Sequence, residues 1–112
     1  MSATLLTGEE LLGLFELDEA GTVLYSRIEP GGTGPEMSGR NFYDEVAPFE
    51  NVAEFRRHVT EFTLGASPAD SFKFDCQYAG CIHPVKVLLA RIRERVHHDR
   101  TKSVLVHIRK VA

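Results

Sequence analysis

The feature that most constrains the fold is a set of three alternating apolar runs in the last third of the 112-residue chain. They cover residues 71–78, 85–93 and 103–109. Alternation sends successive side chains to opposite faces of a strand, so each run predicts a strand with a buried face. A turn beginning at Ala79-Gly80 and a polar loop over residues 94–102 connect them. Such short connections favour antiparallel pairing, so this region predicts a three-stranded antiparallel sheet.

In the last of these three runs, the side chains predicted to face inward are Val104, Val106 and Ile108. Two further apolar runs, residues 14–17 and 23–28, flank a turn that contains Gly21. A glycine takes positive φ without steric penalty, so this region predicts a β-hairpin. Before it, Thr7-Gly-Glu-Glu10 has the form of a capping box and predicts a short helix over Gly8–Leu12.

The middle of the chain carries the helical signals. Four apolar residues recur at steps of three and four and predict an amphipathic helix over residues 52–64: Val52, Phe55, Val59 and Phe62. Gly65 stands where a C-cap glycine ends such a helix. Residues 41–46 predict one helical turn, which ends before Pro48 because proline has no amide to donate. The order predicts an α+β fold, a five-stranded antiparallel sheet with helices on one face.

Bulk composition indicates a single soluble domain. Hydrophobic residues make up 43% and charged residues 26% of the chain, as in ordinary globular domains. No apolar run approaches the ~20 residues that span a bilayer, and the start lacks the basic segment and apolar core of a signal peptide. We therefore predict one cytoplasmic domain over residues 1–112, with residues 1–7 flexible and with Cys76 and Cys81 reduced.

Residues 39–55 carry the most specific motif, Gly-Arg-Asn-Phe-Tyr-Asp-Glu-Val-Ala-Pro-Phe-Glu-Asn-Val-Ala-Glu-Phe. This stretch resembles the signature of the photoactive yellow protein branch of the PAS domains. There, a glycine, a basic residue, an asparagine and two aromatic residues lead through Asp-Val-Ala-Pro to a cysteine. The resemblance implies the PAS fold from about Leu14 to Val111 and a role in bacterial signal transduction.

The resemblance also implies where a ligand site would lie. In that family the cysteine carries the chromophore as a thioester, and a tyrosine and a glutamate four positions apart bind its phenolate oxygen. Phe49 stands in the place of the cysteine, and a phenyl ring has no nucleophile, so we predict no photocycle. Tyr25 and Glu29 have the spacing of the phenolate-binding pair, whereas an ungapped alignment puts Ser26 and Pro30 there.

A small apolar cavity is predicted on the helical side, filled by aromatic side chains or by a small ligand. Its candidate ligand-binding residues are Tyr25, Glu29, Phe42, Phe49, Phe55 and Phe62. Some PAS sensors bind haem through a histidine on the corresponding helix. His58 lies beside the apolar stripe rather than on it, so no cofactor is predicted and a haem or small-molecule sensor is the alternative.

Charge is unevenly spread along the chain. Residues 1–84 hold 14 Asp and Glu against 5 Lys and Arg, whereas residues 85–112 hold 2 against 8. PAS sheets commonly bind partners through their outer face, so the resemblance implies that this face contacts a separate signalling protein or a second copy. The candidate partner-binding residues are Arg91, Arg93 and Arg109.

The same basic stretch raises nucleic-acid binding as a second alternative. Its cations are Arg91, Arg93, Arg95, Arg100, Lys102, Arg109 and Lys110. No aromatic residue occurs from Arg91 onward, although nucleic-acid sites usually add exposed aromatic rings or a groove-reading helix. Partner binding is therefore the preferred interpretation.

Other chemistry finds little support in the sequence. Cys76, Cys81 and His83 are three candidate zinc ligands, but structural zinc sites use four at more regular spacing, so no metal is predicted. The chain has no P-loop, dinucleotide glycine fingerprint, His-Glu-x-x-His motif or nucleophile elbow. We therefore predict that it is not an enzyme.

Overall fold

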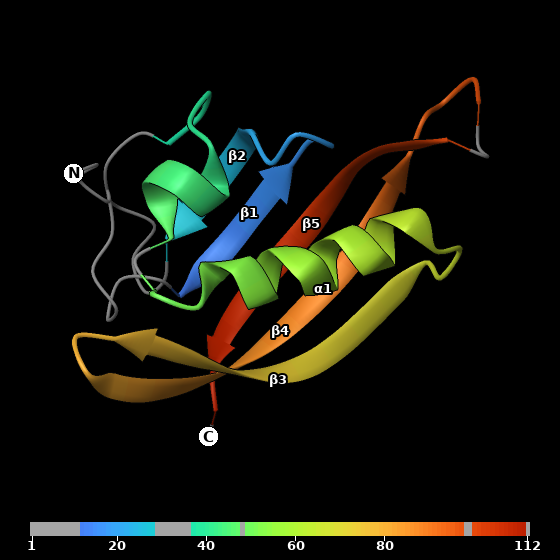
Figure 1. Ribbon diagram of the computed structural model, residues 1–112. Helices are drawn as coiled ribbons and strands as arrows, with labels where there is room; N and C mark the ends of the chain where they lie inside the picture. The colour runs from blue at the N-terminus through green and yellow to red at the C-terminus, as the bar shows by residue number, and fades with distance from the viewer. Residues whose placement is uncertain (1–11, 29–36, 48, 98–99, 112) are drawn as a thin grey trace.

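The computed structural model describes residues 12–28, 37–47, 49–97 and 100–111 (Figure 1). The elements follow the predicted order: β1 (Gly13–Leu17), β2 (Val23–Ile28), the π-helical turn η1 (Phe42–Val46), α1 (Val52–Leu64), β3 (Ala69–Tyr78), β4 (Cys81–Arg93) and β5 (Thr101–Lys110). The flexible start predicted for residues 1–7 and all but the last residue of the helix predicted over Gly8–Leu12 lie outside the described residues.

The five strands form one sheet in the order β2-β1-β5-β4-β3, with every neighbouring pair antiparallel. β1 joins the N-terminal hairpin to the C-terminal strands, because it pairs with β5 from Gly13↔Ile108 to Leu17↔Val104. In Figure 1, α1 crosses one face of the sheet. The predicted α+β fold is confirmed.

Two turns set the strand registers. Ala79 and Gly80, with φ of 53° and 77°, join β3 to β4 so tightly that pairing begins at Tyr78↔Cys81. Two positive φ values match the two-residue hairpin turns whose twist suits the strands. β4 therefore starts at residue 81 rather than at the predicted residue 85. Gly21 has φ of 86°, and a Cβ there would lie 2.6 Å from the Tyr43 ring, so this turn requires glycine.

The helix α1 begins and ends at the predicted residues and is held at both ends. The Asn51 side chain donates to the carbonyl of Asp75 (2.8 Å) and accepts from the amide of Gln77 (3.0 Å), which fixes the helix start to β3. Gly65 ends the helix, and its amide donates to the carbonyls of Glu61 and Phe62. Its φ of −83° is not the left-handed conformation usual for a C-cap glycine.

The core lies between the sheet and the two helices. Val104, Val106 and Ile108 are buried, as predicted, and so are Phe74 and Cys76 on β3. No helix in residues 12–28, 37–47, 49–97 and 100–111 is long and apolar enough to cross a membrane. Phe55, Val59 and Phe62 of α1 are buried in this core.

Candidate functional site

An aromatic cluster occupies the place where the sequence predicts a pocket. Phe55 lies at its centre, with ring centroids 5.4 Å from Phe49, 5.4 Å from Phe74 and 5.8 Å from Phe42. Such distances are typical of rings in direct contact. Phe42 and Phe55 are fully buried and Phe49 is 3% exposed. These predicted residues therefore come together, but they fill the space themselves instead of lining a cavity.

The predicted pair Tyr25 and Glu29 does not join this cluster. Tyr25 pairs with Glu16 and is 47% exposed, so it lies on the face of the sheet away from the helices. Ser26 is the residue that pairs with buried Phe15 and faces inward. The cause is an irregularity between Glu16 and Leu17, which changes the pairing that simple alternation predicts. Glu29 lies outside the described residues.

The prediction that Arg91 lies on the outer face is wrong. Along β4 it shares a face with the buried Val87 and Leu89, so its side chain points toward α1. Its guanidinium donates to backbone carbonyls around the end of α1, namely those of Phe62, Thr63 (3.0 Å), Gly65 (3.0 Å) and Ser67 (3.1 Å), and to the Thr101 hydroxyl (2.5 Å).

This contact set explains why an arginine stands there. The last carbonyls of a helix lack intrahelical donors and carry partial negative charge, so a cation with five N–H groups satisfies them. The guanidinium carbon also lies 4.8 Å from the centre of the Phe62 ring. Arg93 is directed to the same side and donates to the carbonyl of Ala66 (3.5 Å). Arg91 therefore stabilises the helix end, and both arginines are directed away from the predicted partner surface.

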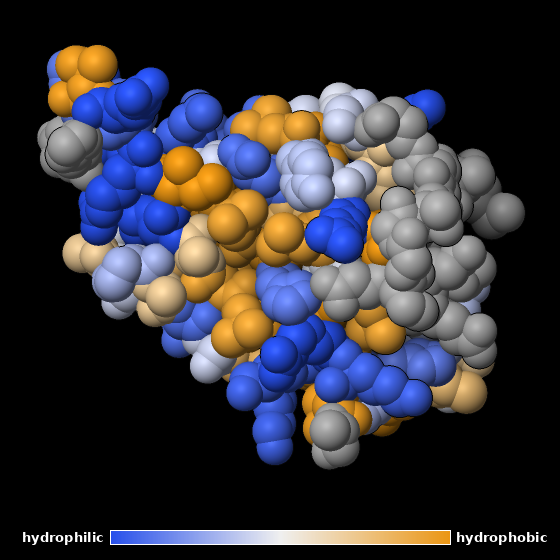
Figure 2. All heavy atoms as spheres, turned by 180° about the vertical axis from the view of Figure 1, so that it is seen from behind, coloured by the Kyte–Doolittle hydropathy of each residue, from blue (hydrophilic) through white to orange (hydrophobic). Residues whose placement is uncertain are grey.

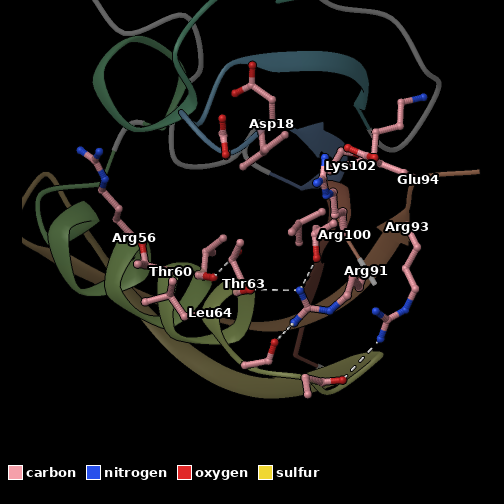
Figure 3. Close-up of a pocket in the computed structure, with 18 of the residues that line it drawn as sticks. Asp18, Arg56, Thr60, Thr63, Leu64, Arg91, Arg93, Glu94, Arg100 and Lys102 are labelled. Atoms are coloured by element: carbon pink, nitrogen blue, oxygen red, sulfur yellow. Dashed lines mark hydrogen bonds between the residues drawn. The ribbon is translucent and has the colours of Figure 1, made fainter. Parts of the chain in front are cut away.

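A groove of about 840 Å³ opens beside these arginines (Figure 3). It lies between the β1–β2 turn, the C-terminal half of α1 and the β4–β5 hairpin. Its charged lining residues are Asp18, Glu19, Arg56, Arg91, Arg93, Glu94, Arg100 and Lys102. Sequence reasoning missed this groove because its walls come from five separate segments of the chain. Several of its charges already serve the fold: Asp18, for example, accepts the amides of Ala20 and Thr22 in its own turn.

The basic stretch considered for nucleic acid does not form one surface. Arg91, Arg93, Arg100 and Lys102 line the groove on the helix side. Arg109 pairs with Lys86, and alternation with buried Ile108 places both on the opposite face. A patch that combines all the predicted cations is therefore contradicted by the register of β4 and β5.

Histidine and cysteine positions bear on the haem and zinc hypotheses. His58 is stacked on Phe72, with ring centroids 4.4 Å apart and planes 15° apart. Burial raises the pKa of the Cys76 thiol to about 12, and the carboxylate of Asp75 adds to the rise. Cys81 is exposed. Within the described ranges, no three His, Cys, Asp or Glu side chains gather as metal ligands.

The face of the sheet away from α1, called here the outer face, has an apolar middle. Leu14 pairs with His107, which in turn pairs with Leu88, and Ala90 pairs with Leu105 in the next row. These residues are half-buried, and neither described helix covers them. Figure 2 views this face directly and shows apolar residues gathered across its middle, with hydrophilic residues around them. Arg109 is the one predicted partner-binding residue that lies on it.

Comparison with known proteins supports the fold and the resemblance. No protein-family model matches the chain. It is 33% identical over 79 residues to photoactive yellow protein of Halochromatium salexigens, a match that covers 67% of this chain but spans only 62% of that relative. Its fold matches the PAS domain of BvgS from Bordetella pertussis with a TM-score of 0.60 and 13% identity, over 90% of this chain and 77% of that one. The chain therefore has the PAS fold and resembles photoactive yellow protein in sequence.

Proposed function

We propose that this domain is a sensory or protein-interaction module of signal transduction that acts through a separate partner, and that it is not photoactive. The observation that carries the proposal is the outer face, where an apolar middle lies on a sheet that neither described helix covers on that side. Contiguous exposed apolar surface commonly marks a protein interaction site. The middle of the opposite face is covered by α1 and the aromatic cluster, so the outer face is the surface that we assign to a partner.

The absence of photoactivity is proposed from the thiols. Phe49, which the resemblance sets in the place of the chromophore-bearing cysteine, packs against Phe55 and Phe74. Cys76 is buried, and burial raises its pKa to about 12, so the nucleophilic thiolate is scarce at neutral pH. Cys81 is exposed and is the first residue of β4, directly after the β3–β4 turn.

Addition of activated p-coumaric acid tests this part. Wild-type protein should give no covalent yellow product, as read by visible absorption and intact mass. Phe49→Cys is the matched variant: it places a thiol at this position and removes the ring that packs against Phe55 and Phe74, and it should give the covalent product that the wild type lacks. A stable thioester on Cys76 or Cys81 of the wild type would contradict the proposal.

Partner binding is tested with two double variants of equal charge change. Leu88→Asp with Leu105→Asp places carboxylates in the apolar middle of the outer face. Ala53→Asp with Thr60→Asp does the same on the exposed side of α1. We expect the first pair to lose a partner or a self-association that wild type and the second pair retain, measured by quantitative cross-linking and sedimentation. Equal retention by both pairs would remove the outer face from consideration.

A second candidate is sensing of a small polar ligand in the groove. Its volume of about 840 Å³ supports this candidate, because ligand sites commonly enclose about 300–1,000 Å³. A panel of small polar metabolites should then raise the melting temperature of the wild type but not of Thr60→Trp, which fills the groove. For haem, a Soret band in the purified protein is the required signal, although the stacking of His58 on Phe72 argues against it.

A further inference from the structure

Three cations stand side by side across three neighbouring strands of the outer face. Lys73 of β3 pairs directly with Lys86 of β4, and Lys86 pairs directly with Arg109 of β5. Directly opposed residues of antiparallel strands have Cβ atoms about 4.5–5.5 Å apart, and like charges in such pairs destabilise a sheet. All three side chains are exposed. We call them the cationic row.

No carboxylate of the described residues neutralises this row. The one ion pair within 4.0 Å that they form joins Arg40 and Glu45, far from these strands. Asp75 follows two residues after Lys73 on the same face, opposite Pro84, and makes no ion pair there. The row therefore holds three positive charges with no ion pair within 4.0 Å among the described residues and with Asp75 as the carboxylate beside it on this face, which is an arrangement suited to receive an anionic group from outside.

The cationic row borders the apolar middle of the outer face. Lys86 is two residues before Leu88 on β4, and Arg109 is two residues after His107 on β5, so the next row across the sheet is Leu88, His107 and Leu14. The row after that holds Ala90 and Leu105. A ligand that covers this face thus meets apolar side chains with the cationic row along one edge, and with Arg27 beside Leu14 and Glu16 beside Leu105.

We infer that the outer face binds an acidic amphipathic helix of a partner protein, which lies across the strands with its carboxylates on the cationic row. The inference rests on the proposed function and names the chemistry of its partner. Neighbouring strands are about 4.8 Å apart, so the three cations span about 10 Å. A helix rises about 1.5 Å per residue, so carboxylates at positions i, i+3 and i+7 fall at about 0, 4.5 and 10.5 Å and match that spacing.

A second copy of this chain fits the face less well. A two-fold interface brings the same face against itself, so the cationic row would need an acidic counterpart there. The carboxylates of β1 and β3 that share this face are Glu16 and Asp75. Glu16 already accepts a hydrogen bond from the Ser103 hydroxyl (2.7 Å). The apolar middle likewise disfavours a free nucleic acid, which offers phosphates without an apolar stripe.

The test selects helical 18-residue peptides with random surface positions on the full-length wild-type protein. The selected pool should be rich in Asp and Glu at positions i, i+3 and i+7 beside a leucine stripe. Its members should lose at least tenfold in affinity on Lys73→Glu/Lys86→Glu/Arg109→Glu. The control Arg57→Glu/Arg95→Glu/Lys102→Glu changes net charge equally at exposed residues off this face and should keep binding. A peptide with its acids changed to lysine should regain affinity for the row-reversed variant.

The outcomes separate this inference from the function on which it rests. One contrary outcome is that the selected peptides lose affinity on Leu88→Asp/Leu105→Asp and yet carry no net charge, or bind the row-reversed variant as well as the wild type. Either result would support the outer face as the docking surface but overturn the acidic partner. A pool indifferent to both sets of changes would overturn both. Tighter row-dependent binding to phosphatidylserine vesicles than to any selected peptide would overturn the inference in favour of a lipid surface.

Discussion

The two faces of this sheet use the same residue types for opposite purposes. On the inner face, aromatic rings from η1, α1 and β3 close the space, and Arg91 directs all five N–H groups to acceptors of the fold. On the outer face, neither described helix covers the apolar side chains, and Arg109 stands beside Lys86 rather than beside a carboxylate of the described residues. Stability is therefore concentrated on the inner face, while the outer face retains unsatisfied charge and apolar area that a partner would satisfy.

The largest difference between the faces should appear on truncation of an apolar side chain. Phe55→Ala removes a fully buried ring that packs against four others, so the free energy of unfolding should fall by about 3–5 kcal/mol. Leu105→Ala on the outer face should lower it by only about 1 kcal/mol, because that side chain is half-buried. Urea denaturation measures both. Equal losses would mean that the outer face is as much a part of the core as the inner one.

Arginine truncation should show the next largest difference. Arg91→Ala leaves the carbonyls at the end of α1 without their donor, so we expect a loss of about 2–4 kcal/mol in the free energy of unfolding. Arg91→Lys keeps the charge but loses the planar fork, and should recover only part of that loss. Arg109→Ala is the matched control on the outer face and should change stability by less than about 0.5 kcal/mol. A stable Arg91→Ala protein would show that water replaces the guanidinium at no cost.

Sequence patterns predicted the elements because each depends on local periodicity. Alternation located the strands, and the three-to-four spacing located α1 at its observed bounds. The face of Arg91 was also readable, since alternation from Val87 and Leu89 places it inward. This alternation contradicts the assignment of Arg91 to the partner-binding outer face, which rests on the resemblance alone. The face of Tyr25 was not readable, because it depends on an irregularity between Glu16 and Leu17.

The cationic row shows which strand registers can be predicted from the sequence and which cannot. The two-residue turn at Ala79-Gly80 fixes Tyr78↔Cys81 and therefore also the pair Lys73↔Lys86. The second pair, Lys86↔Arg109, follows a longer loop and an irregularity between Ile92 and Arg93, which no pattern specifies. The groove is less predictable still, because five separated segments meet to form it. Local structure is encoded locally, whereas surfaces built from several segments depend on the packed fold.

Alkaline pH should weaken the inner face specifically. Burial raises the pKa of the Cys76 thiol from 9.0 to about 12, and burial, partly offset by Arg56, raises the pKa of Tyr43 from 10.0 to about 12. Between the pKa values of the unfolded and folded states, the folded protein keeps protons that the unfolded chain has released. The free energy of unfolding is therefore at its full value below pH 9 and falls as the pH rises toward 12. Unfolding by urea from pH 7 to pH 11 measures this decline.

The matched variants assign the decline to one thiol. In Cys76→Ala its onset should move up by about one pH unit, to the range where unfolded tyrosine ionises. Cys81→Ala, which alters the exposed thiol, should leave the onset where it is in the wild type. An onset that stays near pH 9 in Cys76→Ala would show that another buried group is responsible.

The smallest expected effect is a gain in stability on the outer face. Lys86 lies between Lys73 and Arg109, so Lys86→Glu replaces two like-charge contacts by two opposite-charge contacts. The free energy of unfolding should rise by about 0.5–1 kcal/mol at low salt. The gain should shrink in 1 M salt, where the screening length falls to about 3 Å. Lys102→Glu, at the groove, is the control for net charge. A variant that is more stable yet binds acidic peptides less well would mark the cationic row as a feature kept for recognition at the expense of the fold.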